Sequence, residues 1–527
     1  MANDKDFQWR QAAGWLLCVG FLLPQVQDIF HRSGLRWLYI LTLSFLLSLH
    51  LTPLAIKAAF HYGILDQPEH RKVHKNPTPR LGGLAIYLAF ITSILANNIL
   101  DHTVVVIMLA ATMVVLISVF DDIRSLPAKL KLAVQLIACL FVYWYGIRIS
   151  LFPVHGVGQI TAMASQAGNF FLTFLWIVGI TNAMNFIDGT DGLASGLGAV
   201  ISMFLGTVAI LTHQADLGWL ALAMMGSCLG FLPYNFRNSG PALIFLGDTG
   251  STFIGFTLAC LAITGNWAEK SALVSICTPV LLFGVLIFDM TQTTISRIVT
   301  GKVRNFREWV SYVGQDHIHH RLYRLFQHNK KTVFFILGIS SCLGISAIVL
   351  RQVDHFHSLL IVFQGFIAFV MFSAVNFYQE KALIKGHNTR SEFRVQESFD
   401  VTISLADQDK KLNGTVLDIS HSGAKILVQK DIPLAVGTVV KIGISELDFG
   451  DQFLPAGTVI RTRDVIIDET QEGYLECGVK FQPGDSVTIM RLVDYLHEQQ
   501  LKKHQEEIMR HLSPAPEQAD AGHVPSR

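Results

Sequence analysis

Charged side chains are scarce in this sequence of 527 residues. Asp, Glu, Lys and Arg make up 15% of it, whereas an ordinary soluble domain carries about 25%. The 41 basic and 40 acidic residues nearly cancel, leaving a formal net charge of +1. A basic nucleic-acid binder is therefore excluded, and we expect no nucleic-acid partner. A content of 51% hydrophobic residues also excludes a disordered chain.

Paired cysteines are missing as well. The seven cysteines stand singly, six of them inside apolar runs, and none forms a CxxC pair. Neither a disulfide framework nor a zinc site is indicated. We expect these side chains to act as small buried apolar groups.

The shortage of charge is uneven along the chain. Of the 81 charged residues, 40 lie in residues 380–527, about 27% of that segment, and 41 in residues 1–379, about 11%. The chain therefore consists of two parts that join near residue 380, the first suited to lipid and the second to water. The predicted divisions are an N-terminal extension over 1–35, a membrane domain over 36–379, a linker over 380–397, a soluble domain with a closing helix over 398–511 and a disordered tail over 512–527.

Apolar runs long enough to cross a bilayer recur through the first body, because a spanning helix needs about 20 mostly apolar residues. Eleven runs qualify: 36–59, 82–100, 102–120, 130–150, 169–187, 192–212, 216–234, 241–264, 271–292, 332–350 and 355–377. The shorter run from Ala12 to Pro24 lacks the length and flanks of such a span. It is either interfacial or a further helix, and it does not resemble a cleavable signal peptide.

Basic residues gather in alternate loops, those that follow the odd-numbered runs. These loops are 57–80, 121–131, 182–191, 234–240 and 297–331. Loops rich in Lys and Arg stay in the cytoplasm, so we expect these five loops on the cytoplasmic side. An odd number of spans places the soluble domain on that side too.

Carboxylates stand at the membrane edge in two places. Asp121 and Asp122 directly follow the apolar run that ends at Phe120, and Asp248 lies within the apolar segment 241–264. Such charges are costly unless a cation or water compensates them. A divalent, oxygen-preferring cation such as Mg²⁺ meets this demand. The alternatives are a solvated helix end for the pair and a structural ion pair for Asp248.

Amide and carboxylate side chains interrupt another apolar stretch between Asn182 and Gly192. On a helix, Asn182, Asn185 and Asp188 share one face through their i, i+3 spacing. Asp191 follows in the same run, and the neighbouring glycines allow a tight backbone turn. This grouping indicates a ligand site rather than contact with lipid.

Imidazole and basic side chains occupy the same loops. His317, His319, His320 and Arg321 lie in the fifth loop and are suited to bind a metal or a pyrophosphate. Zinc usually brings cysteine or a more closed ligand set, so we interpret them as phosphate or substrate contacts. A basic rim that would also suit anionic headgroups completes the group: Arg71, Lys72, His74, Arg80, Lys129 and Lys131.

Carboxylates for Mg²⁺, a basic rim and a position at the bilayer edge together predict phosphoryl-transfer chemistry. One substrate would be soluble and anionic, and the other would be borne on a lipid.

Five motifs in order over residues 60–331 resemble the polyprenyl-phosphate N-acetylhexosamine-1-phosphate transferases. That family includes the bacterial enzymes that begin O-antigen, enterobacterial common antigen and teichoic acid synthesis, and the phospho-MurNAc-pentapeptide transferase. The motifs are Asp66 to Gly83, Asp121–Asp122, Asn182 to Gly192, Gly247 to Ser251, and His317 to Arg321. Such an ordered set is far more specific than any single short motif.

The resemblance implies an integral membrane enzyme of eleven helices in the bacterial inner membrane. It would use Mg²⁺, with Mn²⁺ as an alternative. It would move a sugar-1-phosphate from a UDP-sugar, an N-acetylhexosamine in most of the family, to undecaprenyl phosphate and release UMP. The His-Ile-His-His order is closer to the simple UDP-sugar branch than to the peptidoglycan branch. Dimers are common in the family, so a homodimer is among the expected states.

The resemblance also implies residue roles. Asp248 would bind Mg²⁺ against the UDP pyrophosphate, helped by Asp188 or Asp191. Asp121 or Asp122 would deprotonate or position the lipid phosphate. Nucleotide, metal-ligand and pyrophosphate contacts would come from Asn182, Asn185, His317, His319, His320 and Arg321. Some family members carry an acid three residues before the first histidine; Gly314 holds that position here, with Asp316 nearby.

The soluble domain follows a different period. Apolar and polar residues alternate in 401–405, 414–419, 424–428, 439–444 and 475–481. Period two with Gly and Asp turns predicts a small antiparallel β-barrel. A helix is expected over about 485–511, because its apolar residues recur at helical spacing.

Two short motifs in this domain suit a nucleotide. Arg390 and Arg394 precede the first strand, and arginine forks bind phosphate or a guanine edge. Asp418, Ser420 and Gly423 lie between two strands and offer an acceptor, a hydroxyl and close backbone approach. Each motif alone is also typical of a solvated linker or an ordinary turn. Together they resemble the PilZ domain, a receptor for cyclic di-GMP, over about residues 388–497.

Three functions compete at this point. The first is an active transferase controlled by cyclic di-GMP, which the intact carboxylates favour. The second is a membrane-bound cyclic di-GMP receptor whose transferase core is inactive. The third is a lipid or sugar transporter, which would place polar residues deep in several spans rather than at one end. UMP release from UDP-sugars distinguishes the first two.

Overall fold

The computed structural model describes two compact units, one helical and one a β-barrel. The described residues of the first are 2–66, 78–152, 158–238, 240–267, 272–305 and 316–351, with some positions between 308 and 314 and between 360 and 370; residues 67 and 77 are described too but fall outside this unit. Those of the second are 399–405, 411–420, 423–429, 434–444, 456–466 and 473–481. The expected closing helix over 485–511 and the tail lie outside these residues.

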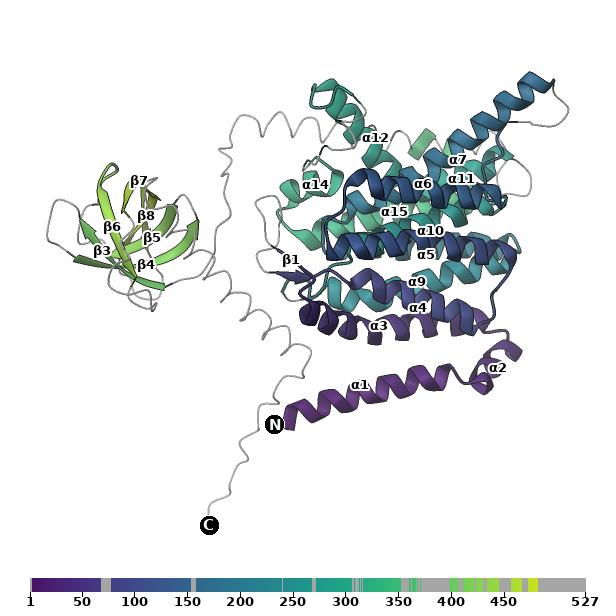
Figure 1. Ribbon diagram of the computed structural model, residues 1–527, viewed down its shortest axis with the longest axis horizontal. Coiled ribbons are helices and arrows are strands. Elements are labelled where there is room, and N and C mark those ends of the chain that lie inside the picture. Colours follow the sequence, from purple (N-terminus) through teal and green to yellow (C-terminus); the bar gives the residue numbers. More distant parts are fainter. Residues whose placement is uncertain are drawn as a thin grey trace, which may run out of the picture. The chain divides into compact units, whose positions relative to one another are not determined.

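Fourteen helices are described in the first unit (Figure 1). They are α1 (Ala2–Phe21), α2 (Pro24–Arg32), α3 (Arg36–Tyr62), α4 (Gly82–Ala96), α5 (His102–Ile123), α6 (Ala128–Trp144), α7 (Gln159–Ile187), α8 (Leu193–Leu211), α9 (Ala215–Asn235), α10 (Gly247–Thr264), α11 (Ala272–Leu282), α12 (Gly284–Val299), α14 (Ile318–Phe326) and α15 (Asn329–Leu350). Two short strands, β1 (Leu65–Asp66) and β2 (Thr78–Pro79), pair antiparallel.

Within the described residues, six helices are long and apolar enough to cross a membrane, or up to eight if two bent pairs each count as one span. Each of the first ten predicted runs falls on a helix, although α4, α6 and α10 are shorter than their runs. The run 271–292 divides into two helices bent by 71° at Phe283. The run 355–377 lies almost wholly outside the described residues. The total of eleven spans therefore stays a prediction.

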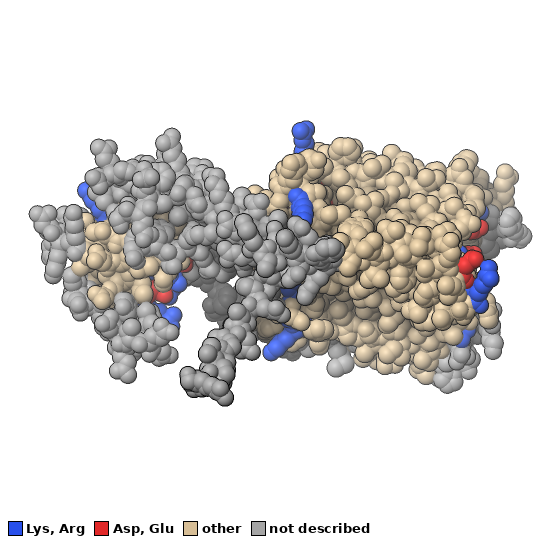
Figure 2. Space-filling model, turned by 90° about the horizontal axis from the view of Figure 1, so that it is seen from below, with Lys and Arg blue, Asp and Glu red and all other residues tan. Residues whose placement is uncertain are grey.

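The surface of the helical unit agrees with a membrane environment. In Figure 2 its charged side chains stand at the two ends, and the broad surface between them is uncharged. Large apolar side chains of its helices, such as Leu109, Leu116 and Phe171, are more than half exposed. Apolar surface of this extent is stable against lipid but not against water.

The N-terminal extension is helical, as one of the two alternatives for its apolar run predicts. Residues Ala12–Phe21 and Pro24–Arg32 form a pair bent by 59°. Gln27 donates to the carbonyl of Ala96 at 2.9 Å, which ties α2 to the end of α4. This end also holds Arg36, whose Nη2 donates to the carbonyl of Asn97 at 2.6 Å.

α10 forms the centre of the helical unit. It packs on α4, α5, α7 and α8, and nearly all of its residues are buried. Glycines allow the closest helix approaches around it, as is typical in membranes. A Cβ on Gly83 of α4 would lie 2.0 Å from the amide nitrogen of Gly250 on α10.

The second unit is a closed barrel of six antiparallel strands in the order β3-β4-β5-β8-β7-β6. These are β3 (Phe399–Leu405), β4 (Lys411–Ser420), β5 (Gly423–Gln429), β6 (Val439–Ile444), β7 (Ala456–Ile466) and β8 (Gly473–Phe481). Alternate side chains such as Val401, Ile426 and Val479 fill its core. The predicted alternation thus yields a barrel that closes without a free edge.

One strand, β7, has no counterpart among the five predicted stretches. Its register against β8 shifts between Val459 and Arg461. Val459 is buried, but Ile460, which is 56% exposed, and the next residue, Arg461, are both exposed. A bulge of this kind inserts an extra residue and breaks the period of two, so alternation does not reveal the strand.

The substitution of Gly230 on α9 tests a close contact between two helices of the helical unit. A Cβ there would lie 2.3 Å from the carbonyl oxygen of Phe45 on α3, so Gly230→Ala forces the two backbones apart. We expect a loss of about 1–3 kcal/mol, the usual effect of overpacking, measured as a lower thermal unfolding midpoint in detergent. Gly179→Ala on α7 is the matched control, because nothing lies within 4 Å of its Cβ. Equal midpoints for the two variants would contradict this packing.

Candidate active site

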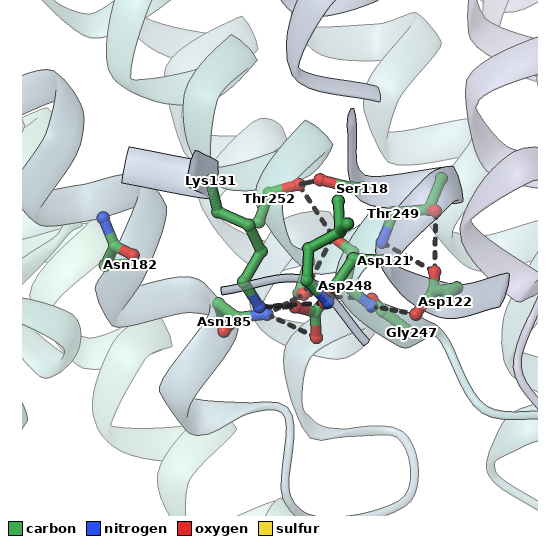
Figure 3. Close-up of polar contacts among 12 residues, drawn as sticks. Ser118, Asp121, Asp122, Lys131, Asn182, Asn185, Gly247, Asp248, Thr249 and Thr252 are labelled. Atoms are coloured by element: carbon green, nitrogen blue, oxygen red, sulfur yellow. Dashed lines mark hydrogen bonds and ion pairs between the residues drawn. The ribbon is translucent and has the colours of Figure 1, made fainter. Parts of the chain in front are cut away.

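The five predicted loops meet at one end of the helical unit. Arg80 of the first loop approaches Asp122 of the second, and Asn185 of the third contacts Asp248 at the start of α10. The fifth loop reaches the same place, because the rings of His317 and Phe186 stack with centroids 5.3 Å apart. Residues 120 and more apart in the sequence therefore form one polar cluster (Figure 3).

Asp122 is the anchor of this cluster. Its Oδ1 accepts from the amide of Asp248 at 3.0 Å, and its Oδ2 accepts from the amide and the hydroxyl of Thr249 at 3.0 and 2.7 Å. These amides belong to the first turn of α10, which has no cap of its own at Leu246. Asp122 thus caps α10 from α5, and its side chain is completely buried.

Lys131 joins the other two carboxylates. Its Nζ donates to Asp121 Oδ2 at 2.9 Å and to Asp248 Oδ2 at 2.7 Å. Asp121 Oδ1 also accepts from the amide of Leu126 at 2.7 Å. The side chain of Asp248 is 18% exposed and that of Asp121 8%. Asp248 is therefore the carboxylate of this group most accessible to a ligand.

The two asparagines predicted for the site make their contacts in different places. Asn185 donates to Asp248 Oδ1 at 3.1 Å and to Ser251 Oγ at 2.9 Å. Asn182 instead donates to Gln135 Oε1 at 2.8 Å, and Figure 3 shows it apart from the carboxylate cluster. The i, i+3 spacing places both on α7, but only Asn185 reaches the carboxylates.

The first loop contributes Arg80. Its Nη1 lies 3.3 Å from Asp66 Oδ1 and its Nη2 3.6 Å from Asp122 Oδ1, so it bridges the β1–β2 hairpin and the cluster. Lys129, of the predicted rim, is exposed at the start of α6. The predicted contacts Arg71, Lys72 and His74 lie outside the described residues.

Asp188 and Asp191 follow the C-terminus of α7. The pKa of Asp188 is raised well above its usual value by burial and by the charges of Asp248, Asp122 and Asp191. Burial raises the pKa of Asp191 to about 6, although its carboxylate accepts from the amide of Ala242 at 3.2 Å. These carboxylates therefore share one field of negative charge, which favours a cation.

The histidines of the fifth loop differ in their surroundings. His317 is hydrogen-bonded on both sides, to Asp289 and Arg297. Neither ring nitrogen of His319 has a hydrogen-bond partner, although this residue is only 1% exposed. Its ring lies against Gly189, where a Cβ would be 2.5 Å from Nε2. His319 thus brings an unsatisfied imidazole beside Asp188.

Burial keeps two of these imidazoles neutral near neutral pH. It lowers the pKa of His319 well below its usual value, together with the charges of His320 and His317. Burial also lowers the pKa of His320, to about 4. Arg321 is buried as well, and its Nε donates to the carbonyl of Asp316 at 2.6 Å.

Sequence reasoning named Asp316 only as a neighbour of the histidines and missed two buried ionic residues behind this loop. Asp289 and Arg297 lie on α12, and Arg297 forms a two-bond fork on Asp316, with N–O distances of 2.8 and 2.7 Å. The criterion that selected Asp248, a lone carboxylate in an apolar run, applies equally to Asp289 in the run 271–292. Applying it there would have found this residue.

The donor set suits Mg²⁺ in part. Among the described residues, no three His, Cys, Asp or Glu side chains converge to hold a metal ion. Protein sites for Mg²⁺ on phosphates usually supply only one or two carboxylates, the rest coming from substrate and water. Asp121 and Asp248 already share one cation, the Lys131 ammonium. The carboxylate excess is thus compatible with Mg²⁺ brought together with a phosphorylated substrate.

The barrel places the second predicted motif on one hairpin. Ser420 pairs with Gly423 across the turn between β4 and β5, and Asp418 pairs with Lys425. Asp418 is buried. A Cβ on Gly423 would lie 2.3 Å from the carbonyl oxygen of Val479, so strand packing alone requires this glycine. Arg390 and Arg394 lie outside the described residues.

Comparison with known proteins identifies relatives of both units. Residues 104–266 match the glycosyl transferase family 4 and residues 388–498 the PilZ domain. The chain is 36% identical over 321 residues to the probable undecaprenyl-phosphate N-acetylglucosaminyl 1-phosphate transferase of Bacillus subtilis (strain 168), covering 61% of this chain and 86% of that protein.

A second relative is the decaprenyl-phosphate N-acetylglucosaminephosphotransferase of Mycobacterium tuberculosis (strain CDC 1551 / Oshkosh), 32% identical over 305 residues, covering 53% of this chain and 73% of that protein. Among solved structures, the PilZ domain with c-di-GMP of YcgR from Escherichia coli matches with 20% identity and a TM-score of 0.19, covering 23% of this chain and 99% of that chain.

A substitution at Gly247 tests whether Asp122 anchors the start of α10. It has φ +74°, and a Cβ there would lie 2.5 Å from the carbonyl oxygen of Arg80 and 2.8 Å from Asp122 Oδ2. Gly247→Ala should therefore displace the carboxylate and lower the thermal unfolding midpoint. Gly146→Ala is the matched control, because Gly146 also has a positive φ, +94°, but open space around its Cβ. It should lose only the left-handed penalty of about 1–2 kcal/mol, and an equal loss in both would argue against the anchor.

Proposed function

Because this chain belongs to glycosyl transferase family 4 and carries a C-terminal PilZ domain, we propose that it transfers a sugar-1-phosphate from a UDP-sugar to undecaprenyl phosphate. The relatives are polyprenyl-phosphate sugar-phosphate transferases. The observation that carries the proposal is the Asp121–Lys131–Asp248 group at one end of the helices. UMP would be released, and the lipid-linked sugar would begin a polysaccharide.

The transfer moves one phosphoryl centre between two oxygens. By direct attack or through a covalent aspartyl intermediate, an oxygen of undecaprenyl phosphate becomes bonded to the phosphorus attached to the sugar. The bond from that phosphorus to the bridging oxygen breaks, and the bridging oxygen leaves with UMP. Negative charge gathers on the leaving phosphate, so fixed positive groups lower the barrier.

Asp248 is the residue we assign to Mg²⁺, or to Mn²⁺ as an alternative, with Asp188 or Asp191 beside it. The metal would neutralise the pyrophosphate of the UDP-sugar. The exposure of Asp248 and its bond from Asn185 support this assignment, because an oriented carboxylate is a better ligand than a mobile one. Lys131 would then turn its ammonium from the carboxylates to a phosphate.

Asp121 is the member of the pair that we assign to the lipid phosphate. Asp122 is committed to three hydrogen bonds at the start of α10, whereas Asp121 faces Lys131, and its side chain is 8% exposed against 0% for Asp122. Asp121 would accept a proton from the lipid phosphate or hold it in line. The groups assigned to the pyrophosphate are Arg80, His319, His320 and Arg321.

We propose a place in the bacterial inner membrane, with the site facing the cytoplasm. UDP-sugars are cytosolic, and the basic loops that carry the site favour that side. We propose the same side for the PilZ domain. There it would bind cyclic di-GMP through Arg390, Arg394 and the β4–β5 hairpin and regulate the transferase. The expected homodimer stays a prediction.

Asp248→Asn tests the transferase site. Loss of the charge removes the metal ligand, so UMP release from UDP-N-acetylglucosamine with undecaprenyl phosphate and Mg²⁺ should fall by about 100-fold or more, as for other lost transition-state contacts. Asp101→Asn, at the first turn of α5 on the opposite end, is the matched control and should retain activity. Turnover near that of the unaltered protein in Asp248→Asn would refute the assignment. A panel of UDP-sugars identifies the preferred sugar.

Arg394→Ala tests cyclic di-GMP binding by the full chain. Loss of one charge-assisted hydrogen-bonding fork of about 1.5–3 kcal/mol should weaken equilibrium binding about tenfold or more. Lys441→Ala, an exposed position on β6, should bind normally. UMP release is then compared with and without saturating cyclic di-GMP. Normal binding by Arg394→Ala would contradict the site, and equal UMP release would contradict the regulation.

A further inference from the structure

Asp289 is a buried carboxylate in the middle of α12, only 2% exposed. Its Oδ2 accepts from His317 Nδ1 at 2.7 Å and its Oδ1 from the amide of Ile318 at 2.6 Å. Both oxygens therefore hold the same short segment of the fifth loop. A carboxylate inside an apolar helix is rarely retained without such a task.

The bond to Ile318 caps α14. His317 is the residue before that helix, and its side chain makes no capping bond. Asp289 supplies the missing acceptor from α12, so the start of α14 is tied to a membrane helix. The histidines and arginine of the site lie in this first turn, and their positions depend on the cap.

The opposite side of the His317 ring faces a cation. Arg297 Nη2 lies 3.4 Å from His317 Nε2, and Arg297 is held by its fork on Asp316. A guanidinium only donates hydrogen bonds, and an ionised carboxylate only accepts them. The partners therefore assign the proton to Nδ1, facing Asp289, and leave Nε2 without one.

We propose that Asp289 is a positioning residue that acts through His317, and that His317 itself serves as scaffold rather than as an acid, a base or a phosphate contact. This inference rests on the proposed function. Both nitrogens of His317 are already engaged within the protein, whereas those of His319 have no partner. Asp289, Arg297 and Asp316 thus fix the one histidine that holds the turn carrying His319 and His320.

Asp289→Asn separates this role from simple packing. The amide keeps the size of the side chain, and its oxygen still caps α14. Its NH₂ group, however, faces His317 Nδ1 and requires that nitrogen to accept. The proton then moves to Nε2, where it points at the Arg297 donor. Folding is retained but the tautomer is wrong.

The kinetic test measures UMP release by Asp289→Asn, by His317→Asn and by the double variant. Asp289→Asn should lower turnover about 10–100-fold, as loss of an orienting partner does, with an unfolding midpoint near that of the unaltered protein. His317→Asn keeps a donor toward Asp289. The double variant should be no worse than the poorer single variant, because the two act as one unit. Multiplied losses would overturn the proposal. Asp28→Asn, exposed on α2, is the matched control.

A second test needs no activity. Nitrogen NMR of protein labelled with ¹⁵N-histidine, after subtraction of the His317→Asn spectrum, reports the tautomer of His317. The expected signal is a protonated Nδ1 and a bare Nε2, which Asp289→Asn should exchange. A protonated Nε2 in the unaltered protein would refute the positioning role. Absence of UMP release by the unaltered protein would instead refute the proposed function, so the two failures are distinguishable.

Discussion

The bond between the Asp122 carboxylate and the first turn of α10 is the interaction on which the site depends. α10 is the buried centre of the helical unit, and its first amides have no acceptor of their own. In a medium without water such amides must be satisfied by the protein. Asp122 satisfies them from α5, and Gly247 makes room for it with a positive φ. The next residue, Asp248, is thereby held facing Lys131.

The same solution occurs a second time, where Asp289 of α12 caps α14. Two of the buried carboxylates thus serve helix ends, and this leaves a smaller set of polar groups free for chemistry. Asp121, Asp248 and Lys131 form one half of that set, and the unsatisfied imidazole of His319 belongs to the other. A division of this kind gives a rigid frame to a site assembled from loops, because each capping carboxylate links two helices. Asp122 on α5 binds α10, 126 residues further on, and Asp289 on α12 binds α14, 29 residues further on.

The chain joins two units that are stabilised by different interactions. The helical unit is held by close contact of small residues and by apolar surface toward lipid. The barrel is held by an apolar core between antiparallel strands and is charged outside. Both proposed ligands of the chain besides the lipid are phosphate-bearing nucleotides, and both would meet arginine and carboxylate side chains. The difference in charge density along the sequence reflects this division between lipid and water.

The sequence by itself determined which segments are apolar, which loops carry charge and where the period changes to two, because hydrophobicity and spacing are local properties. It therefore predicted the helices, the barrel and the residues of the cluster. It did not reveal β7, whose bulge breaks the period, and it treated Asp121 and Asp122 as equivalent. Only the tertiary structure decided that Asp122 is an anchor and that Asn182 lies apart from Asn185. Hydrogen-bond partners between 47 and 127 residues away make these choices, and no local pattern records them.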